Sequence, residues 1–439
     1  MKKRIIFITK DFFPTSNGTI LCIENVLPYL APKYEIILYT KKTSADSLEV
    51  EVQDGVRIIR PKSLIDSVVL KKHSIVMQLK SRGRRIPSFT AQLIRVVLYP
   101  FTILSRIFGY LQDISWENNI ARYIRKHEKH HETDAIIAVG APFENFRAAC
   151  LLKNKLKASR LILLQFDHYA DNPELLLLDP ADKKNYERRM AEEKDWYQTA
   201  DRIIVTYEMI NAVSSNHVTL KGKIEAAGMP SFYGMADLKP SSILKQSGDP
   251  FIDIVYTGLF YKDIRNPDYA LETISRVITM NDHIRLHILG FGCEDIIAGY
   301  KNKLMDNLII HGHQSKQVAI NARYSANVLL NVSNSVGSQA PSKILEYIGS
   351  CKPIINFFAI DGDLCVEYLK DYPSSISIRA DYDRIDENAK ALYDFIMQAK
   401  DMTCDPDEIM RHYRKYHPSA YAEQIIAAIE AAKGDYERI

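Results

Sequence analysis

Apolar segments of strand length alternate with amphipathic helical segments along both halves of the chain, and this alternation limits the fold more than any other feature. Helical patterns lie between the strand patterns, including residues 19–30 and a segment that begins at Pro267. The buried-strand patterns fall at residues 4–9, 34–40, 134–140, 161–166, 253–258, 284–290 and 326–333. Strands that alternate with helices build parallel sheets covered by helices, so the sequence predicts an α/β protein.

The length of 439 residues favours two such domains over one core. A polar stretch with two prolines and a glycine, residues 237–250, has the composition of an interdomain linker. We therefore expect an N-terminal domain over residues 1–236 and a C-terminal domain over residues 251–417. A further helix is expected in the terminal segment 418–439, which has an apolar stripe at its start.

Cysteine usage and hydropathy predict a cytoplasmic location. The six cysteines are scattered without a C-x-x-C pair, which favours reduced thiols and argues against a structural zinc site. The first residues, MKKRIIFITKDFF, have the pattern of a strand and not of a signal peptide. No run approaches the roughly 18 apolar residues of a membrane-spanning helix.

The distribution of charge is more informative than its sum. The net charge of +3 is too small to predict nucleic-acid binding. Between Arg60 and Arg106, however, the sequence contains ten Lys and Arg residues and only one acidic residue, Asp66. The basic residues are interleaved with large apolar residues. The segment 63–112 therefore fits two interpretations: a helix lying on the anionic inner face of the plasma membrane, or a basic helix whose apolar side packs into the N-terminal core.

A loop, a short helix and a strand between residues 338 and 358 have the arrangement of a ligand site. The loop-to-helix start follows a strand, which is where open α/β sheets bind ligands and where helix amides favour phosphate oxygens. Lys343 lies in the first helical turn, where its charge opposes the helix dipole, and a bound anion would account for it. Glu346 lies one turn further along.

The string P-S-K-I-L-E-Y, followed by G-S-C-K-P-I-I, resembles the donor-site signature of the GT-B glycosyltransferases, in the large retaining family that builds bacterial surface polysaccharides. The resemblance implies two Rossmann-like domains that face a cleft, with a C-terminal helix that crosses back to the N domain. It also implies that Glu346 receives the ribose hydroxyls of a UDP- or GDP-sugar, beside Ser338, Pro341 and Ser342. The family's E-x7-E pattern is incomplete, because Ser338 stands at the first acidic position.

The same resemblance assigns two loops to the donor diphosphate. In the loop YTGLFYKDIRNPD the family has an arginine directly after the glycine, Gly258, and a lysine six residues later; this chain has Leu259 and Arg265 there. Guanidinium binds phosphate in a fork, so Arg265 preserves a suitable cation. In the N domain, Asn17 and Gly18 stand where the family has a glycine-rich loop. Their other interpretation is a plain helix entry capped by Asn17 or Ser16.

Asp167 and His168 follow the strand pattern at 161–166, on the rim that faces a ligand in parallel sheets. The resemblance places a loop bearing histidine or aspartate here, near the acceptor and the donor sugar, which makes both residues catalytic candidates. The alternative is a structural histidine. Gly290 and Gly292 predict a turn, because the remaining glycine of a dinucleotide-binding loop is missing.

Together these features predict a retaining glycosyltransferase that needs no metal and no cofactor beyond its nucleotide-sugar substrate. Arg265, Lys343 and the two helix starts are expected to neutralise the departing diphosphate. A saccharide on a membrane lipid carrier is the expected acceptor, and contact with an anionic membrane the expected peripheral interaction. Two alternatives stay open: a nucleotide-sugar 2-epimerase of the same architecture, and a binding subunit that has lost catalysis, as Ser338 would allow.

Overall fold

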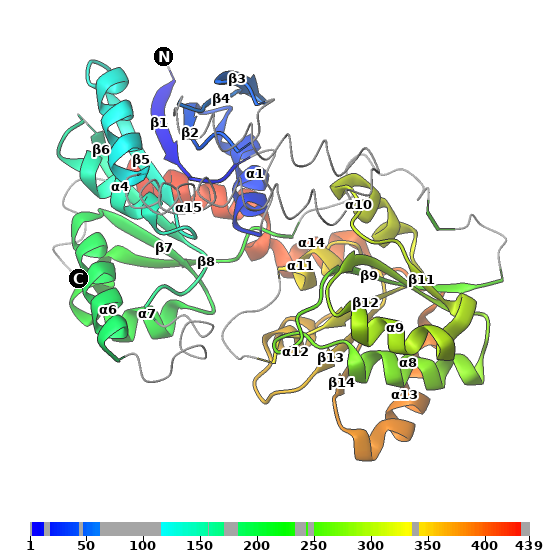
Figure 1. Cartoon of the computed structure of the whole chain (residues 1–439). Coiled ribbons are helices and arrows are strands. Elements are labelled where there is room, and N and C mark those ends of the chain that lie inside the picture. Colours follow the sequence, from blue (N-terminus) through cyan, green and yellow to red (C-terminus); the bar gives the residue numbers. More distant parts are fainter. Residues whose placement is uncertain are drawn as a thin grey trace, which may run out of the picture. The chain divides into compact units, whose positions relative to one another are not determined.

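The computed structural model divides the chain into two compact units (Figure 1). Unit 1 comprises Met1–Gly228 with Ser419–Ile439, and unit 2 comprises Met229–Pro418. The structure describes residues 2–12, 18–43, 47–61, 116–156, 158–170, 183–232, 243–244, 250–335 and 342–431. Most of the expected linker and the whole basic segment 63–112 lie outside the described residues.

Unit 1 is built on an eight-stranded sheet with the order β3-β4-β2-β1-β5-β6-β7-β8. All neighbouring strands are parallel except β3 and β4, which form an antiparallel hairpin. Parallel strands need crossover helices, and these cover the sheet and exclude water from its centre. The strands are β1 (Lys3–Ile8), β2 (Tyr34–Tyr39), β3 (Val50–Gln53), β4 (Val56–Ile59), β5 (Thr133–Val139), β6 (Ala158–Gln165), β7 (Arg202–Thr206) and β8 (Ile224–Ala227).

The last described helix, α15 (Pro418–Glu430), packs against unit 1 although it follows unit 2 in the chain (Figure 1). The ring of Tyr421 stacks on Phe166 with centroids 5.5 Å apart, and the Tyr34 hydroxyl donates to Glu430 over 3.2 Å. This is the return of the C-terminal helix that the resemblance implies. The other helices of unit 1 are α1 (Gly18–Leu30), α4 (Glu144–Lys153), α6 (Lys183–Thr199) and α7 (Ile210–Asn216), with residues 116–128 also helical.

Unit 2 contains a six-stranded, fully parallel sheet with the order β11-β10-β9-β12-β13-β14. Its strands are β9 (Ile252–Leu259), β10 (Ile284–Phe291), β11 (Leu308–Ile310), β12 (Val328–Val332), β13 (Ile354–Phe358) and β14 (Ser375–Arg379). One core joins the sheet to α8 (Asp268–Met280), α9 (Glu294–Leu304) and α13 (Ile385–Ala399). A second core joins it to α10 (Lys316–Ser325), α11 (Lys343–Ile348), α12 (Leu364–Leu369) and α14 (Pro406–Tyr413).

The strands expected from the sequence are confirmed to within a few residues, and the fold class is confirmed with them. The hairpin of β3 and β4 was not predicted, because β3 is a short strand of four residues whose valines are exposed. The sequence nevertheless contains a local signal for this hairpin, the dipeptide Asp54-Gly55. Both residues have positive φ (50° and 79°), as the two-residue turn of a tight hairpin requires.

The two glycines at 290 and 292 serve close backbone packing. A Cβ at Gly290 would lie 1.7 Å from the carbonyl oxygen of Gly258 on the neighbouring strand. Gly292 has φ +98°, and a Cβ there would lie 2.2 Å from the carbonyl oxygen of Phe260. Both positions therefore exclude side chains because β9 and β10 run together to their ends.

Within the described part of the chain, no helix combines the length and the hydropathy needed to cross a membrane. The expectation of a membrane-surface segment at 63–112 stays a prediction, because it falls outside the described residues.

Candidate functional site

The two central strands of unit 2 separate at their carboxyl ends. β12 pairs with β9 only through Val328–Ile254 and Leu329–Val255. On its other side, β9 stays paired with β10 as far as Leu259 and Phe291. The strand order also reverses between β9 and β12, so this is the topological switch point, where open α/β sheets bind ligands.

Helix α11 is fixed to the free edge of β9 at this point. The Tyr347 hydroxyl accepts a hydrogen bond from the backbone N–H of Thr257 over 2.8 Å and donates to its carbonyl oxygen over 3.3 Å. Tyr347 is fully buried. The hydroxyl satisfies backbone groups that β12 no longer reaches, and it holds α11 beside Gly258.

Glu346, the neighbour of Tyr347, is a buried carboxylate with two cationic partners. The Lys343 ammonium lies 3.1 and 3.0 Å from its two oxygens, and the guanidinium of Arg323 on α10 donates to Oε2. Burial alone would raise the pKa of Glu346, but Lys343 and Arg323 outweigh it and hold the pKa at about 2. The carboxylate is therefore ionised at neutral pH.

The cluster of Arg323, Lys343 and Glu346 contains two basic groups and one acid. Arg323 is almost fully buried, whereas 31% of the Lys343 side chain is exposed. Burial lowers the pKa of Lys343, and Glu346 opposes that effect. The anion beside Lys343 in this structure is thus Glu346. Arg323 was not among the residues predicted from the sequence, since nothing in α10 marks it as a partner of α11.

Arg265 is oriented by the loop that follows β12. Its Nε and Nη2 donate to Asn334 Oδ1 over 3.1 and 2.9 Å, and Nη1 donates to the carbonyl oxygen of Leu259 over 3.2 Å. The Ser335 N–H also bonds to the carbonyl oxygen of Ile264 over 2.6 Å, which joins the two loops. These contacts use three of the five guanidinium N–H groups and fix the plane of the fork at the switch point.

Gly258 and Ser342 border the same edge of the unit 2 sheet. Gly258 is the second-last residue of β9 and has φ +149°, a conformation that favours glycine. Ser342 precedes α11 in a helical conformation, and its side chain does not cap the helix. Pro341 and Ser338 fall outside the described residues.

The candidates in unit 1 follow different strands of its sheet. Gly18 is the exposed first residue of α1, and Asn17 lies outside the described residues. Asp167 is half-buried and His168 is buried, both just beyond β6. Sequence reasoning missed Asn145, whose side chain joins the ends of β1 and β5 by accepting from Lys10 N–H and donating to the Val139 carbonyl oxygen.

No group of three or more His, Cys, Asp or Glu side chains that could hold a metal ion occurs among the residues whose positions are described. The site in unit 2 is instead defined by Arg265, Lys343, Arg323 and Glu346 around the switch point.

Solved structures similar to this chain include two sugar-phosphate synthases and a protein bound to UDP and glucose. Sucrose-phosphate synthase from Thermosynechococcus elongatus is 16% identical with a TM-score of 0.57, and the match covers 97% of each chain. Trehalose-6-phosphate synthase OtsA is 11% identical with a TM-score of 0.61, covering 98% of this chain and 100% of that one. Anabaena Alr3699/HepE, solved with UDP and glucose, is 11% identical with a TM-score of 0.60 and the same coverage.

Models of protein families and curated proteins give no match to the sequence. At the identities above, the likeness establishes the fold and not the reaction. This chain has the GT-B fold, with two Rossmann-like units and a C-terminal helix that returns to the first unit.

Proposed function

We propose that this protein is a retaining glycosyltransferase that moves a sugar from a UDP- or GDP-sugar to a saccharide or a lipid-linked saccharide in surface polysaccharide biosynthesis. The observation that carries the proposal is the ionised, buried Glu346 between two cations at the switch point of unit 2. A buried carboxylate that stays charged can accept hydrogen bonds from vicinal ribose hydroxyls. The similar structure of HepE, solved with UDP and glucose and with UDP-glucose, supports the same substrate class.

The proposed roles follow from charge and position. Glu346 binds the ribose, while Arg265 and Lys343 bind the diphosphate, whose negative charge grows as the sugar leaves. Lys343 is suited to this because its exposed fraction allows it to turn from Glu346 towards a phosphate. Arg323 stays behind as the counter-ion of Glu346, so the carboxylate keeps a partner when Lys343 moves.

The proposed reaction retains the configuration at the anomeric carbon. The bond from that carbon to the diphosphate oxygen breaks, and a bond to the acceptor hydroxyl oxygen forms on the same face. The acceptor proton passes to an oxygen of the leaving diphosphate, which balances the step without a further reactant. Because Arg265 and Lys343 supply positive charge, we propose that the reaction needs no divalent metal; Asp167 and His168 remain proposed residues of the acceptor side.

The first experiment is a thermal-shift screen of the full chain against nucleoside diphosphates and nucleotide sugars, with and without EDTA. A ligand that binds the folded state raises the melting temperature. We expect one UDP- or GDP-sugar to stabilise the protein equally in both conditions. Release of its nucleoside diphosphate only when a saccharide acceptor is added would then demonstrate transfer. Absence of any stabilisation across the panel would contradict the proposal.

A second candidate is a nucleotide-sugar-binding subunit without catalysis, which Ser338 favours because it removes an acid that the resembled family has near the anomeric carbon. This candidate predicts the same stabilisation by a donor, with no consumption of that donor in the presence of any acceptor.

We propose further that the basic segment 63–112 brings the protein to anionic membrane, where a lipid-linked acceptor would be found. Sedimentation with vesicles that contain phosphatidylglycerol tests this. We expect binding to weaken steeply with salt and to be lost when residues 66–106 are deleted. Circular dichroism and an unchanged donor-induced thermal shift serve as the control that the deletion variant still folds.

A further inference from the structure

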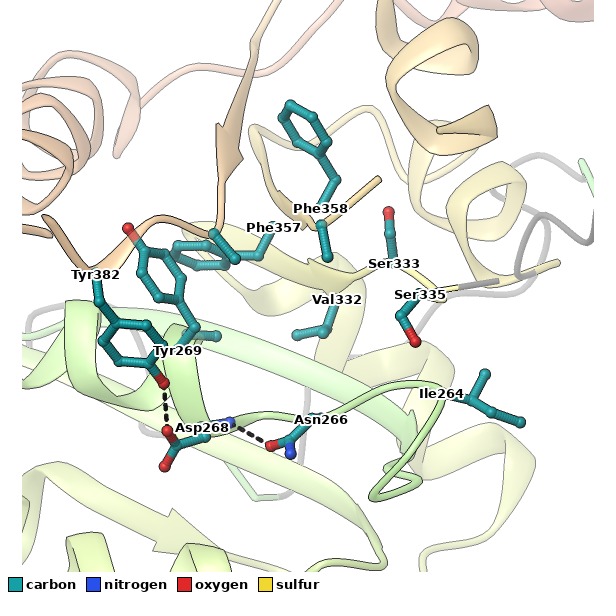
Figure 2. Close-up of a pocket in the computed structure, with 13 residues that line it drawn as sticks. Ile264, Asn266, Asp268, Tyr269, Val332, Ser333, Ser335, Phe357, Phe358 and Tyr382 are labelled. Atoms are coloured by element: carbon teal, nitrogen blue, oxygen red, sulfur yellow. Dashed lines mark hydrogen bonds between the residues drawn. The ribbon is translucent and has the colours of Figure 1, made fainter. Parts of the chain in front are cut away.

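A cavity of about 250 Å³ lies in unit 2 where β12, β13 and β14 end and α8 begins (Figure 2). It is separate from the Glu346 cluster in that none of Arg323, Lys343 and Glu346 lines it. Four aromatic side chains contribute to its wall, namely Tyr269, Phe357, Phe358 and Tyr382.

The aromatic wall is firmly held in place. Tyr269 and Phe357 are buried, with ring centroids 5.9 Å apart, and Tyr269 meets Tyr382 edge to face at 5.1 Å. The Tyr269 hydroxyl donates to the carbonyl oxygen of Asp381 over 2.9 Å and accepts from Asn388 over 2.7 Å. Such rings offer a fixed apolar surface at little cost in conformational entropy.

The polar groups of the cavity offer mainly acceptors. Figure 2 shows the Tyr382 hydroxyl donating to the Asp268 carboxylate, whose other oxygen accepts from Tyr300 over 2.9 Å. The Ser335 hydroxyl donates to the carbonyl oxygen of Asp263 over 2.9 Å, and the Asn266 amide donates to that of Lys262 over 3.2 Å. A carboxylate has about four acceptor positions, so Asp268 can accept further bonds.

The charge of the lining is negative. Asp268 is its only ionisable carboxylate, and no Lys, Arg or His lines the cavity among the residues that the structure describes. A phosphate or a sugar carboxylate would therefore meet a like charge without a counter-ion. A nucleobase would find few free donors for its carbonyl and ring-nitrogen acceptors, because the Ser335 and Tyr382 hydroxyls and one Asn266 N–H already donate within the protein.

We propose that this cavity binds the pyranose ring of a neutral saccharide. Such a ring presents apolar C–H faces to the aromatic wall, and its hydroxyl groups donate to Asp268 and to the serine oxygens. Uronic acids and phosphorylated sugars are excluded by charge. The site thus selects neutral sugars, a specificity that Glu346 and its partners do not provide.

The cavity adjoins the proposed diphosphate site. Ile264 and Asn266 line it on either side of Arg265, and Asn334, which orients Arg265, lies between two lining serines. The neutral ring could therefore belong to the donor or to a separate saccharide. The first of these sources rests on the proposed function, whereas binding of the ring itself does not.

Saturation-transfer NMR on the full chain tests ring binding directly. The probes are methyl glycosides of glucose, galactose, mannose and N-acetylglucosamine, with methyl glucuronide as the acidic counterpart. Ala359→Leu places a larger side chain at the exposed rim of the cavity, and we expect it to weaken binding roughly tenfold or more. Ala298→Leu, on an exposed position of α9, is the matched control and should bind as the wild type does.

Asp268→Asn tests the role of charge. We expect the preference for methyl glucoside over methyl glucuronide to fall roughly fivefold or more, because the like charge is removed. Asp295→Asn is the matched control: Asp268 and Asp295 both lie in the first turn of a helix, but only Asp268 lines the cavity. Using a ratio of affinities removes effects of the substitution on folding.

Competition with nucleotides distinguishes whether the bound ring belongs to the donor or to a separate saccharide. If the ring is that of the donor, a nucleotide sugar displaces the methyl glycoside, and the nucleoside diphosphate alone does not. If it is a separate saccharide, neither displaces it. Binding that Ala359→Leu weakens stands even if no nucleotide binds, which would overturn only the proposed function. The cavity proposal is overturned if no neutral glycoside binds, or if Ala359→Leu and Ala298→Leu behave alike.

Discussion

The guanidinium of Arg323 and the carboxylate of Glu346 form an ion pair in the interior of unit 2, across 23 residues of sequence and between two helices. Both side chains are almost fully removed from water. A charge in this position is costly unless it is paired, and Glu346 has Lys343 as a second partner. Arg323 thereby makes it possible for a carboxylate to stay ionised at the switch point.

Breaking this pair from one side should destabilise the protein strongly. We expect Arg323→Met and Glu346→Gln each to lower the free energy of unfolding by roughly 3 kcal/mol, because each removes one member of a buried ion pair and leaves the other charge less well compensated. The double variant should lose much less than the sum of the two. Urea unfolding measures all three, with Arg276→Met on the exposed side of α8 as control, where a loss below about 1 kcal/mol is expected. Additive losses would show that the two residues are not coupled.

The same cluster predicts how stability responds to acid. The pKa of Glu346 in the folded protein is about 2, below its ordinary value of 4.5, so between these values the unfolded chain binds more protons than the folded one. The contribution of Glu346 is therefore complete above about pH 4.5 and is lost as the pH falls towards 2. Urea midpoints recorded across this range should fall less steeply for Glu346→Gln than for the wild type. Equal slopes would show that Glu346 does not carry this dependence.

Because β9 and β10 approach each other closely, adding a single Cβ atom at Gly290 should destabilise the protein. In Gly290→Ala the new Cβ would meet the carbonyl oxygen of Gly258, so the two strand ends must move apart, at a cost of roughly 1–3 kcal/mol. Gly299→Ala in α9, where a Cβ meets nothing within 4 Å, should instead stabilise by about 0.5–1 kcal/mol. Because Gly258 leads into the Arg265 loop, Gly290→Ala should also reduce the donor-induced thermal shift. A Gly290→Ala variant as stable as Gly299→Ala would contradict this packing.

The buried strands could be predicted from the sequence because fully covered parallel strands are nearly continuous apolar runs, as in residues 326–333 and 354–358. The neighbourhood of Lys343 and Glu346 could be predicted as well, since residues three apart are neighbours on the surface of a helix. These are local relationships, and the sequence contains them directly.

The contacts that complete the site are not local. Arg323 reaches Glu346 only because α10 and α11 cover the same face of the sheet, and Asn334 reaches Arg265 across 69 residues because β9 and β12 are neighbours. No periodicity in the sequence reports on such a pairing between loops. The cavity at the ends of β12, β13 and β14 was missed for the same reason, since its wall comes from four separate segments.

The proposed role of Arg265 can be separated from simple substrate binding by kinetics. If its guanidinium stabilises the charge that grows on the departing diphosphate, Arg265→Gln should lower kcat by roughly 10²-fold or more while KM for the donor changes much less. Arg265→Lys keeps the positive charge but loses the planar guanidinium, so its kcat should lie between those of the wild type and Arg265→Gln. Arg276→Gln, which replaces an ion-paired arginine of α8 away from the site, should keep wild-type kinetics. A rise in KM with unchanged kcat for Arg265→Gln would assign Arg265 to ground-state binding alone, because an interaction of equal strength in the ground and transition states changes affinity but not the rate of the chemical step.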